Sequence, residues 1–475
     1  MAEKPSDAVP EGESSADAPA YEFTDLLFDL LSQQAEILYT AEYVESHESE
    51  IDNAMERTRV TAAIEFPHVD PEVFDMVWDY ISREEEAAED SDKNGDGPAD
   101  GDRPADGDRP ADGDRPADGD EPADARLIAL VEIFKRLPDD CRREYFSLLL
   151  SGHFRPAQGG PRMLSMLLTN LIGDFEVLLS NLMRILFKMH PGAITSPDKG
   201  FAFPDIVKFE SMKAFKTHVM DRAIDRALYD GYAEWLDTLS SKFGITIPGM
   251  AVNDFILEAF QRRHIVVHNG GRVSQQYIDK VPKAFRDVPL GTERPVDVKY
   301  LRRVADHLLV VGISLVCVSG LKQLTDKNHK RILETHAANI LYKLLLARRF
   351  EPVRDVTAEY TSKTFTDTSA GYRWDVNGWL ARKYLGEFDK CRRKVEQWDT
   401  EPLVPIFKLA KLALLDRHEE ALEIGRPLRG TEELSEWFWT SWPLLEGVRA
   451  YEVEQALSQK RAAAGNPGAT LSEPQ

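Results

Sequence analysis

Cysteine is scarce in this chain, and its placement excludes a disulfide-built protein. The 475 residues include only three cysteines, Cys141, Cys317 and Cys391, which are far apart in the sequence. An odd and dispersed set argues against a disulfide framework and is typical of a reducing compartment. No spacing of cysteine and histidine matches a structural zinc site, so we expect neither a metal nor another cofactor.

Long hydrophobic runs and a basic leader segment are also missing. The longest apolar run, Leu308 to Leu321, has about 14 residues, whereas a membrane-spanning helix needs about 20. The N-terminal residues MAEKPSDAVPEGESSADAPA are acidic and polar, unlike a signal or transit peptide. We therefore expect a cytoplasmic protein with no membrane partner. Glycine-rich phosphate loops and nucleophile elbows are absent as well, which excludes two common classes of enzyme.

Positive charge is scarce overall but unevenly distributed. The formal net charge is −23, yet residues 1–125 hold 37 acidic and 8 basic side chains, and residues 126–475 hold 44 and 50. A basic region can bind phosphate backbones, whereas a uniformly acidic protein would repel them. The distribution predicts an acidic N-terminal arm and a mildly basic body.

Low-complexity segments divide the chain. Residues 1–20 and 461–475 show no periodicity and are expected to be disordered. Residues 84–125 carry a Pro-Ala-Asp-Gly-Asp-Arg repeat and predict a flexible linker, because they cannot bury enough apolar surface to offset chain entropy. The aspartate spacing resembles a calcium loop but lacks the closing glutamate, so we favour a tether. Residues 21–83 predict an acidic helical segment, either a hairpin or a helix docked on the body.

Hydrophobic residues recur at helical spacing through most of the remaining chain, which predicts an all-α fold. Residues 126–325 are expected to form a helical bundle. Its longest members would be an apolar helix over residues 163–189 and a closing helix over residues 296–321, whose Val/Ile-rich end indicates full burial.

The most informative stretch runs from Phe255 to Tyr277, with the sequence FILEAFQRRHIVVHNGGRVSQQY. Its first half predicts an amphipathic helix whose apolar face holds Phe255, Ile256, Ala259, Phe260, Val266 and Val267. Arg263 falls near the middle of that face, where a guanidinium needs a carboxylate, a phosphate or a partner chain. His264 and His268 lie on the other side, one turn apart. Asn269-Gly270-Gly271 then ends the helix, because glycine adopts the left-handed conformation without strain.

This stretch resembles the signature of the HEPN superfamily of all-α domains, which is an Arg, a polar residue, three further residues and a His. Here these are Arg263, His264, Ile265-Val266-Val267 and His268. The double arginine, the Val-His-Asn-Gly-Gly run and Tyr277 also resemble the family's longer pattern. The bare spacing recurs elsewhere in the chain, so the match depends on the apolar helix before it and the glycine stop after it. The resemblance covers roughly residues 163–325.

The resemblance implies a metal-independent endoribonuclease, of the kind used in toxin or phage-defence systems, that cleaves RNA by attack of a 2′-hydroxyl. Histidine suits the proton transfers because its pKa lies near neutrality, and arginine suits the phosphate because it binds it in a bidentate manner. In active members two copies dimerise and combine two such motifs in one site. The roles implied are acid/base for His268, phosphate clamp for Arg263, orienting or phosphate-contacting group for His264, further RNA contacts for Arg262 and Asn269, and a carboxylate near Arg263 for Glu176.

Helix geometry adds a condition to this hypothesis. On an ideal helix, Arg263 and His268 point about 140° apart. The two side chains can share one phosphate only if the helix distorts before Gly270 or if a second subunit supplies one of them. The hypothesis therefore requires a homodimer or a distorted helix end.

Three other interpretations stay open. A domain of this type can serve as a non-catalytic module for dimerisation or for binding RNA or protein, with the arginine in a structural salt bridge. His264 and His268 have the i, i+4 spacing of a metal-binding pair. However, the sequence offers no obvious third ligand, and no glutamate lies between the two histidines as in a metalloprotease helix. Glu176 can instead be a solvated glutamate on a helix surface.

Residues 326–460 predict a separate set of helical hairpins. The pairs Asn339/Phe350, Asn377/Phe388 and Phe407/His418 are each 11 residues apart, and successive pairs are offset by 38 and then 30 residues. This pattern resembles degenerate tetratricopeptide-type hairpins, which implies a protein partner on the array. The tryptophans at 437, 439 and 442 are expected to cap it.

The acidic arm admits two interpretations. It can fold back on the basic body as an RNA mimic and restrain it, or it can be a solubilising tail. The sequence alone does not choose between them.

Overall fold

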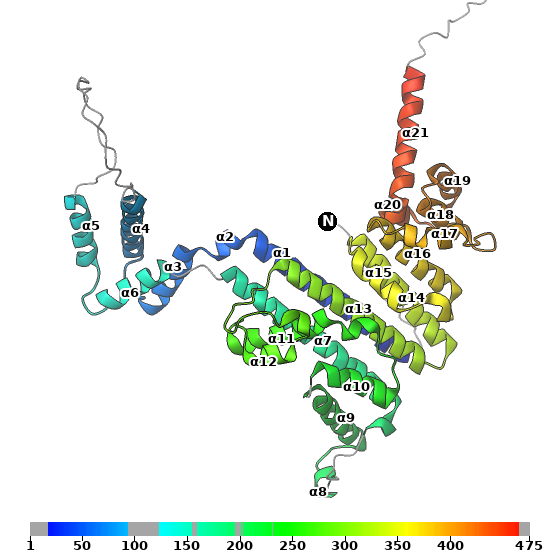
Figure 1. The fold of residues 1–475 in the computed structure, drawn as a ribbon, viewed down its shortest axis with the longest axis horizontal. Helices are drawn as coiled ribbons and strands as arrows, with labels where there is room; N and C mark the ends of the chain where they lie inside the picture. The colour runs from blue at the N-terminus through cyan, green and yellow to red at the C-terminus, as the bar shows by residue number, and fades with distance from the viewer. Residues whose placement is uncertain are drawn as a thin grey trace, which may run out of the picture. The chain divides into compact units, whose positions relative to one another are not determined.

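The computed structural model describes residues 18–93, 123–153, 159–194, 201, 203–229 and 231–464. These residues form helices and no β-strand, so the predicted all-α class is confirmed (Figure 1). Contacts divide the chain into two compact units, residues 1–42 together with 164–475, and residues 43–163. The centre of the predicted linker, residues 94–122, and most of both predicted disordered ends lie outside the described residues.

Helices α1 (Ala18–Ser46) and α7 (Gly159–Met189) contribute residues to both units. The larger unit otherwise contains α8 (Phe203–Ile206), α9 (Met212–Tyr229), α10 (Tyr232–Phe243), α11 (Asp254–Asn269), α12 (Gln275–Lys280), α13 (Val298–Gln323), α14 (Lys327–Leu346), α15 (Phe350–Glu359), α16 (Thr368–Tyr384), α17 (Asp389–Glu396), α18 (Pro405–Leu414), α19 (His418–Leu428), α20 (Glu436–Ser441) and α21 (Glu446–Ala464). The 3-10 helices η1 (Pro191–Ala193), η2 (Gly249–Val252), η3 (Lys283–Phe285), η4 (Ser362–Thr364) and η5 (Pro443–Leu445) lie between them.

The core of the larger unit is built where α1 (Ala18–Ser46), α7 (Gly159–Met189) and α13 meet (Figure 1). A Cβ added to Gly312 of α13 would lie 2.5 Å from Cδ2 of Leu30 and 3.0 Å from Cδ2 of Leu178. The absence of a side chain at Gly312 therefore lets the three helices approach closely. The centre of α13, from Leu308 to Cys317, is buried on all sides, so tertiary packing rather than local propensity stabilises this helix.

The compact units divide the chain differently from the expected domains. Phe23, Leu27 and Leu30 of α1 are buried in the main core, so the first part of the expected acidic arm is the docked helix rather than one half of a free hairpin. Residues 126–163, expected to begin the bundle, belong instead to the smaller unit. Helical periodicity marks which face of a helix is apolar but not which partner covers it, and this explains the difference.

Three helix–turn–helix pairs, α14–α15, α16–α17 and α18–α19, occupy the region expected to form hairpins. Each of their turns contains one residue with a left-handed backbone, at Arg348 (φ 57°), Gly386 (φ 71°) and Asp416 (φ 59°). These positions are offset by 38 and 30 residues, as the sequence pairs are. Helix pairs therefore occupy the region expected to form helical hairpins, while the tetratricopeptide-type arrangement remains a prediction.

The smaller unit contains α2 (Glu48–Ile51), α3 (Ala54–Glu65), α4 (Pro71–Lys93), α5 (Ala123–Arg136) and α6 (Arg142–His153). It has its own small core, in which Phe74 and Trp78 of α4 pack with Tyr145 and Leu149 of α6. The rings of Phe74 and Trp78 stack with their centroids 5.6 Å apart.

Among the residues that the structure describes, two helices, α7 and α13, are long and apolar enough to cross a membrane by length and composition. The expectation from the 14-residue run considered only part of α13. Of the most apolar window of α13, 78% is buried inside the protein, compared with 33% for α7. The burial of α13 is typical of a core helix.

Candidate functional site

The candidate site lies on α11 and the segment that follows it. Asn253 caps the start of α11, because its side chain accepts a hydrogen bond from the backbone N–H of Phe255 at 2.8 Å. At the other end Gly270 takes the left-handed conformation (φ 58°) and its N–H donates to the carbonyl of Ile265. The predicted glycine stop is thus confirmed, and the helix remains α-helical through Asn269.

The buried face of α11 differs from the predicted one. Ile265 is fully buried, whereas Val267, expected on the apolar face, is 50% exposed. Glu258 (0% exposed) and Arg262 (7% exposed) lie in the interior, and Arg263 is only half-buried. The apolar pattern predicted Arg263 in the interior, whereas the interior arginine is Arg262. The pattern treated Glu258 as a surface residue, although a buried carboxylate can hold an arginine beside it in the interior.

Glu258 is the centre of a buried polar network. Its carboxylate accepts hydrogen bonds from Arg262 Nε at 2.8 Å, from the Tyr277 hydroxyl at 2.7 Å and from the Tyr300 hydroxyl at 2.8 Å. The Arg262 guanidinium also donates to the Pro295 carbonyl at 3.2 Å and lies 3.9 Å from the centre of the Tyr300 ring. Because Tyr277 belongs to α12 and Tyr300 to α13, this network fixes α11 against both helices.

Burial and the neighbouring Glu258 carboxylate keep both phenols protonated. Burial, followed by Glu258, raises the pKa of Tyr277 to about 12. The same two causes raise the pKa of Tyr300 well above its usual value. Both hydroxyls therefore donate to Glu258 at neutral pH, and the network serves as a scaffold rather than as a proton relay.

Arg263 forms an ion pair with Glu176 of α7, as expected for a carboxylate near this arginine. Both side chains are about one-third exposed. Burial raises the pKa of Glu176, and the Arg263 charge opposes that rise. Arg263 Nε is buried and has no hydrogen-bond partner among the described residues. The guanidinium is thus positioned by α7 and keeps an unused donor.

The two histidines of the motif lie against each other. The ring centroids of His264 and His268 are 4.6 Å apart, and the ring planes are tilted by 50°. Partial burial lowers the pKa of His264 and so does the charge of His268, while a hydrogen bond with Gln276 opposes these effects. His264 is therefore a neutral imidazole at pH 7 and can accept a proton. His268 and Asn269 are exposed at the helix end.

The structure thus brings together only part of the predicted set. His264 and His268 are adjacent, and Arg263 is paired with Glu176. Because α11 is not distorted before Gly270, the ideal-helix separation of Arg263 and His268 holds. Arg262 lies in the interior network, where its guanidinium is not available to RNA.

Basic residues are concentrated around this helix end. Residues 262–294 hold seven basic and three acidic side chains, although the larger unit as a whole holds 50 acidic and 44 basic ones, a net charge of −6. The expected basic body is therefore not basic overall once α1 and its neighbours are included. The positive charge that can attract phosphate is local to the α11–α13 segment.

Two residues of this surface were not anticipated from the sequence. Gln276 hydrogen-bonds to the His264 ring, and Lys280 is close enough to lower the pKa of His264. They lie one turn apart on α12, an i, i+4 spacing that was available in the sequence. The signal was missed because a helix of six residues has too weak a periodicity to identify its exposed face.

A cavity of about 410 Å³ lies in the helical array of the larger unit. Its lining includes Tyr342 of α14, Arg373 and Asn377 of α16, and Trp442. Arg373 Nε and Trp442 Nε1 are buried and lack hydrogen-bond partners among the described residues. Burial lowers the pKa of Arg373, partly offset by the charge of Asp367. These donors are free to bind acceptor groups.

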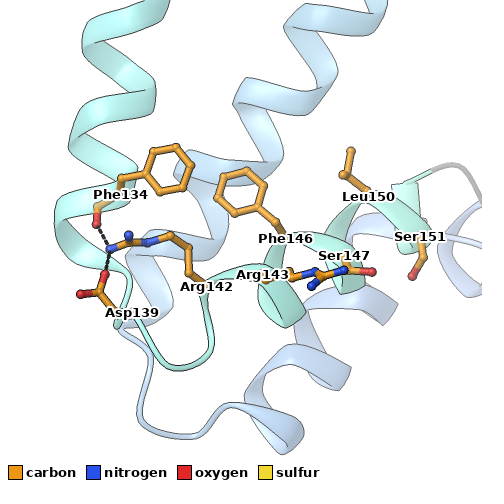
Figure 2. Close-up of a pocket in the computed structure, with 8 residues that line it drawn as sticks. All are labelled: Phe134, Asp139, Arg142, Arg143, Phe146, Ser147, Leu150 and Ser151. Carbon is orange, nitrogen blue, oxygen red and sulfur yellow. Dashed lines mark hydrogen bonds and ion pairs between the residues drawn. The ribbon is translucent and has the colours of Figure 1, made fainter.

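The smaller unit has a cavity of about 790 Å³ between α5 and α6 (Figure 2). Figure 2 shows Arg142 beside Phe134 and Asp139, and its guanidinium binds the Phe134 carbonyl at 2.6 Å and the Asp139 carboxylate at 2.5 Å. The Phe134 and Phe146 rings stack 5.6 Å apart. The charged groups of Asp139 and Arg142 bind each other, so the cavity does not present an acid/base pair to a substrate.

Protein-family models, curated proteins and solved structures were compared with this chain, and none of them matches it. The assignment of function therefore depends on the chemistry of these side chains.

Proposed function

We propose that this chain is a metal-independent endoribonuclease of HEPN type that acts as a homodimer in the cytoplasm. The observation that carries the proposal is the contact between His264 and His268 at the C-terminal end of α11. Their ring centroids are 4.6 Å apart, and basic residues surround this end of the helix. Two adjacent imidazoles can supply the general base and the general acid that RNA cleavage by a 2′-hydroxyl needs. A role in toxin or phage-defence systems follows from the family resemblance alone.

The chemistry can be assigned to named atoms. Neutral His264 accepts the proton of the 2′-hydroxyl while the 2′-oxygen attacks the phosphorus. Protonated His268 donates a proton to the 5′-oxygen as the bond between that oxygen and phosphorus breaks, which leaves a 2′,3′-cyclic phosphate. Arg263 stabilises the charge on the crowded phosphate, and Asn269 positions the backbone beside it.

Dimerisation supplies what one copy lacks. Arg263 is held toward α7 by Glu176, whereas His264 contacts Gln276 of α12. Since the helix is regular, an Arg263 from one copy and a His268 from the other can approach the same phosphate, whereas the two from one copy point apart.

The test compares wild type with His268→Ala, using His218→Ala on the exposed face of α9 as the matched control. Each protein is incubated with total RNA in EDTA, and the fragment ends are analysed. We expect 2′,3′-cyclic phosphate ends from the wild type and from His218→Ala but not from His268→Ala. Cleavage that survives in His268→Ala, or the absence of cleavage by every folded dimer, contradicts the proposal.

A second candidate is a non-catalytic module for dimerisation and for binding RNA or protein. The Glu176–Arg263 pair favours it, because a neutralised arginine fits a structural bridge. On this alternative the array cavity, with the free donors of Arg373 and Trp442, binds a protein partner. The two candidates differ in one result, since the alternative predicts that wild type and His268→Ala bind RNA equally and that neither cuts it.

A further inference from the structure

Three metal-ligating side chains converge at one end of the smaller unit. His68 lies in the turn between α3 and α4, and Asp140 and Cys141 lie in the turn between α5 and α6. The imidazole nitrogen, the carboxylate oxygen and the Sγ atom all lie within 4.8 Å of one another. Because the two turns are far apart in the sequence, no spacing motif marks this cluster, and the sequence predicted no metal.

None of these three side chains makes a strong hydrogen bond or ion pair with another described residue. His68 and Asp140 make no hydrogen bond or ion pair with the other residues that the structure describes. Cys141 is 7% exposed, and the one hydrogen bond of its thiol is a weak contact of 3.7 Å to the Pro138 carbonyl. Cys141 is buried, whereas the exposed His68 and Asp140 side chains can turn toward an ion, so the three offer it a sulfur, an imidazole nitrogen and a carboxylate oxygen.

The neighbouring positive charge does not fill this role. Arg142 follows Cys141 directly, but its guanidinium binds the Asp139 carboxylate and the carbonyls of Phe134 and Leu137. The second arginine, Arg143, is exposed on α6 and makes no hydrogen bond or ion pair with a described residue. The centre of the cluster is therefore free of a competing cation.

We propose that His68, Asp140 and Cys141 bind a zinc ion. A thiolate with an imidazole favours zinc over magnesium or calcium, which prefer oxygen ligands only. Ligand atoms of a tetrahedral zinc site lie about 3.5 Å apart, so the exposed His68 and Asp140 side chains close on the ion by roughly 1 Å. The fourth position is left to water or to another ligand.

The ion would join two turns that only a small core now holds together. It links the α3–α4 turn to the α5–α6 turn, across a unit whose two halves are connected by the long segment after α4. Small helical units often need such a link, and the free energy of metal binding adds directly to the stability of the folded unit. The site is separate from the proposed ribonuclease site and does not depend on it.

The test titrates the full-length protein with Co²⁺ and follows the thiolate-to-cobalt charge-transfer absorption, then displaces the cobalt with Zn²⁺. We expect one equivalent of Co²⁺ to produce the band in the wild type and in the control variant Cys391→Ser. Cys391 is a buried cysteine of the larger unit. Cys141→Ser should lose the band, and His68→Ala should weaken binding more than about tenfold. His68 is exposed, so its substitution leaves the core intact.

Thermal unfolding provides a second readout. Zinc should raise the melting temperature of the wild type and of Cys391→Ser above the value that each protein shows in EDTA, but it should leave that of Cys141→Ser and of His68→Ala unchanged. A wild type without the cobalt band, or a band that persists in Cys141→Ser, overturns the proposal.

Discussion

At the scale of single residues, Glu258 is the group on which the candidate site depends most. It is fully buried and accepts three hydrogen bonds, one of them from the charged Arg262. Glu258→Gln keeps the volume but leaves the Arg262 charge unpaired in the interior. We expect it to lower the free energy of unfolding by about 3 kcal/mol, measured by urea denaturation.

A surface glutamate of the same segment is the control for that substitution. Glu293 pairs with Arg272 at 3.7 Å, and both side chains are more than half exposed. Glu293→Gln should change the free energy of unfolding by no more than about 0.5 kcal/mol. Equal losses in the two variants would show that the Glu258 network does not hold α11 in place.

The His264–His268 contact makes a prediction about pH. Burial and the neighbouring His268 charge lower the pKa of His264 from the usual 6.5. Removing a like charge favours the protonated form, so His268→Gln should raise the pKa of His264. The measurement is an NMR titration of the His264 ring proton, with exposed His218 as the internal reference. An unchanged His264 pKa would mean that the two rings do not interact in solution.

The lowered pKa of His264 also makes the stability of the folded protein depend on pH. Because the pKa of His264 is lower in the folded protein, the unfolded chain binds more protons when the pH falls below about 6.5. His264 therefore reduces stability progressively as the pH falls through that value. The His264 ring is only partly buried, so the effect is small.

At the scale of elements, the turns of the helical array can be tested through their backbone. Gly386 has a φ of 71°, a conformation that costs a residue with a Cβ about 1 kcal/mol. Gly386→Ala should lower the free energy of unfolding by that amount. Gly173 lies inside α7 with open space where a Cβ would be, so Gly173→Ala should raise the free energy of unfolding by about 0.5–1 kcal/mol.

If the two variants change the free energy of unfolding in opposite directions, the effects come from backbone conformation and not from packing. Chemical denaturation of both proteins under one condition gives the comparison. Destabilisation by both would indicate that α7 packs against something at Gly173, contrary to the structure.

Elements were the part of the structure that the sequence predicted best. The start of α4 at Pro71, the end of α11 at Gly270 and the three turns of the array all coincide with proline, glycine or polar signals that act locally. The buried Glu258 was missed for the same reason. Its three donors come from α11, α12 and α13, and local rules cannot anticipate a carboxylate that is satisfied by distant donors.

At the scale of the whole molecule, the sequence did not predict which helices share a core. Residues 18–42 of the acidic arm are packed in the larger unit, and α3 and α4 form the smaller unit with α5 and α6. The cluster of His68, Asp140 and Cys141 was invisible for the same reason, because only folding brings the two turns together. Both depend on partner choice between helices, which periodicity does not encode.

This organisation changes how the acidic-arm hypothesis is tested. Deleting residues 1–125 would remove α1 from the core, so the suitable variant replaces the aspartates of residues 94–122 with asparagine. If this segment acts as an RNA mimic, the variant should bind RNA more tightly at low salt, and the gain should shrink as salt rises. Equal affinity of the two proteins at low salt would identify the segment as a solubilising tail.

Subunit mixing tests whether two copies of the chain share one RNA-cleaving site. Arg263→Ala and His268→Ala are each purified, mixed, and allowed to exchange subunits, and RNA cleavage is measured in EDTA. Each variant alone should be inactive. A mixed dimer regains one site, built from the Arg263 of one copy and the His268 of the other, so the mixture should recover about a quarter of wild-type activity. No recovery after verified exchange would contradict a site shared between two copies.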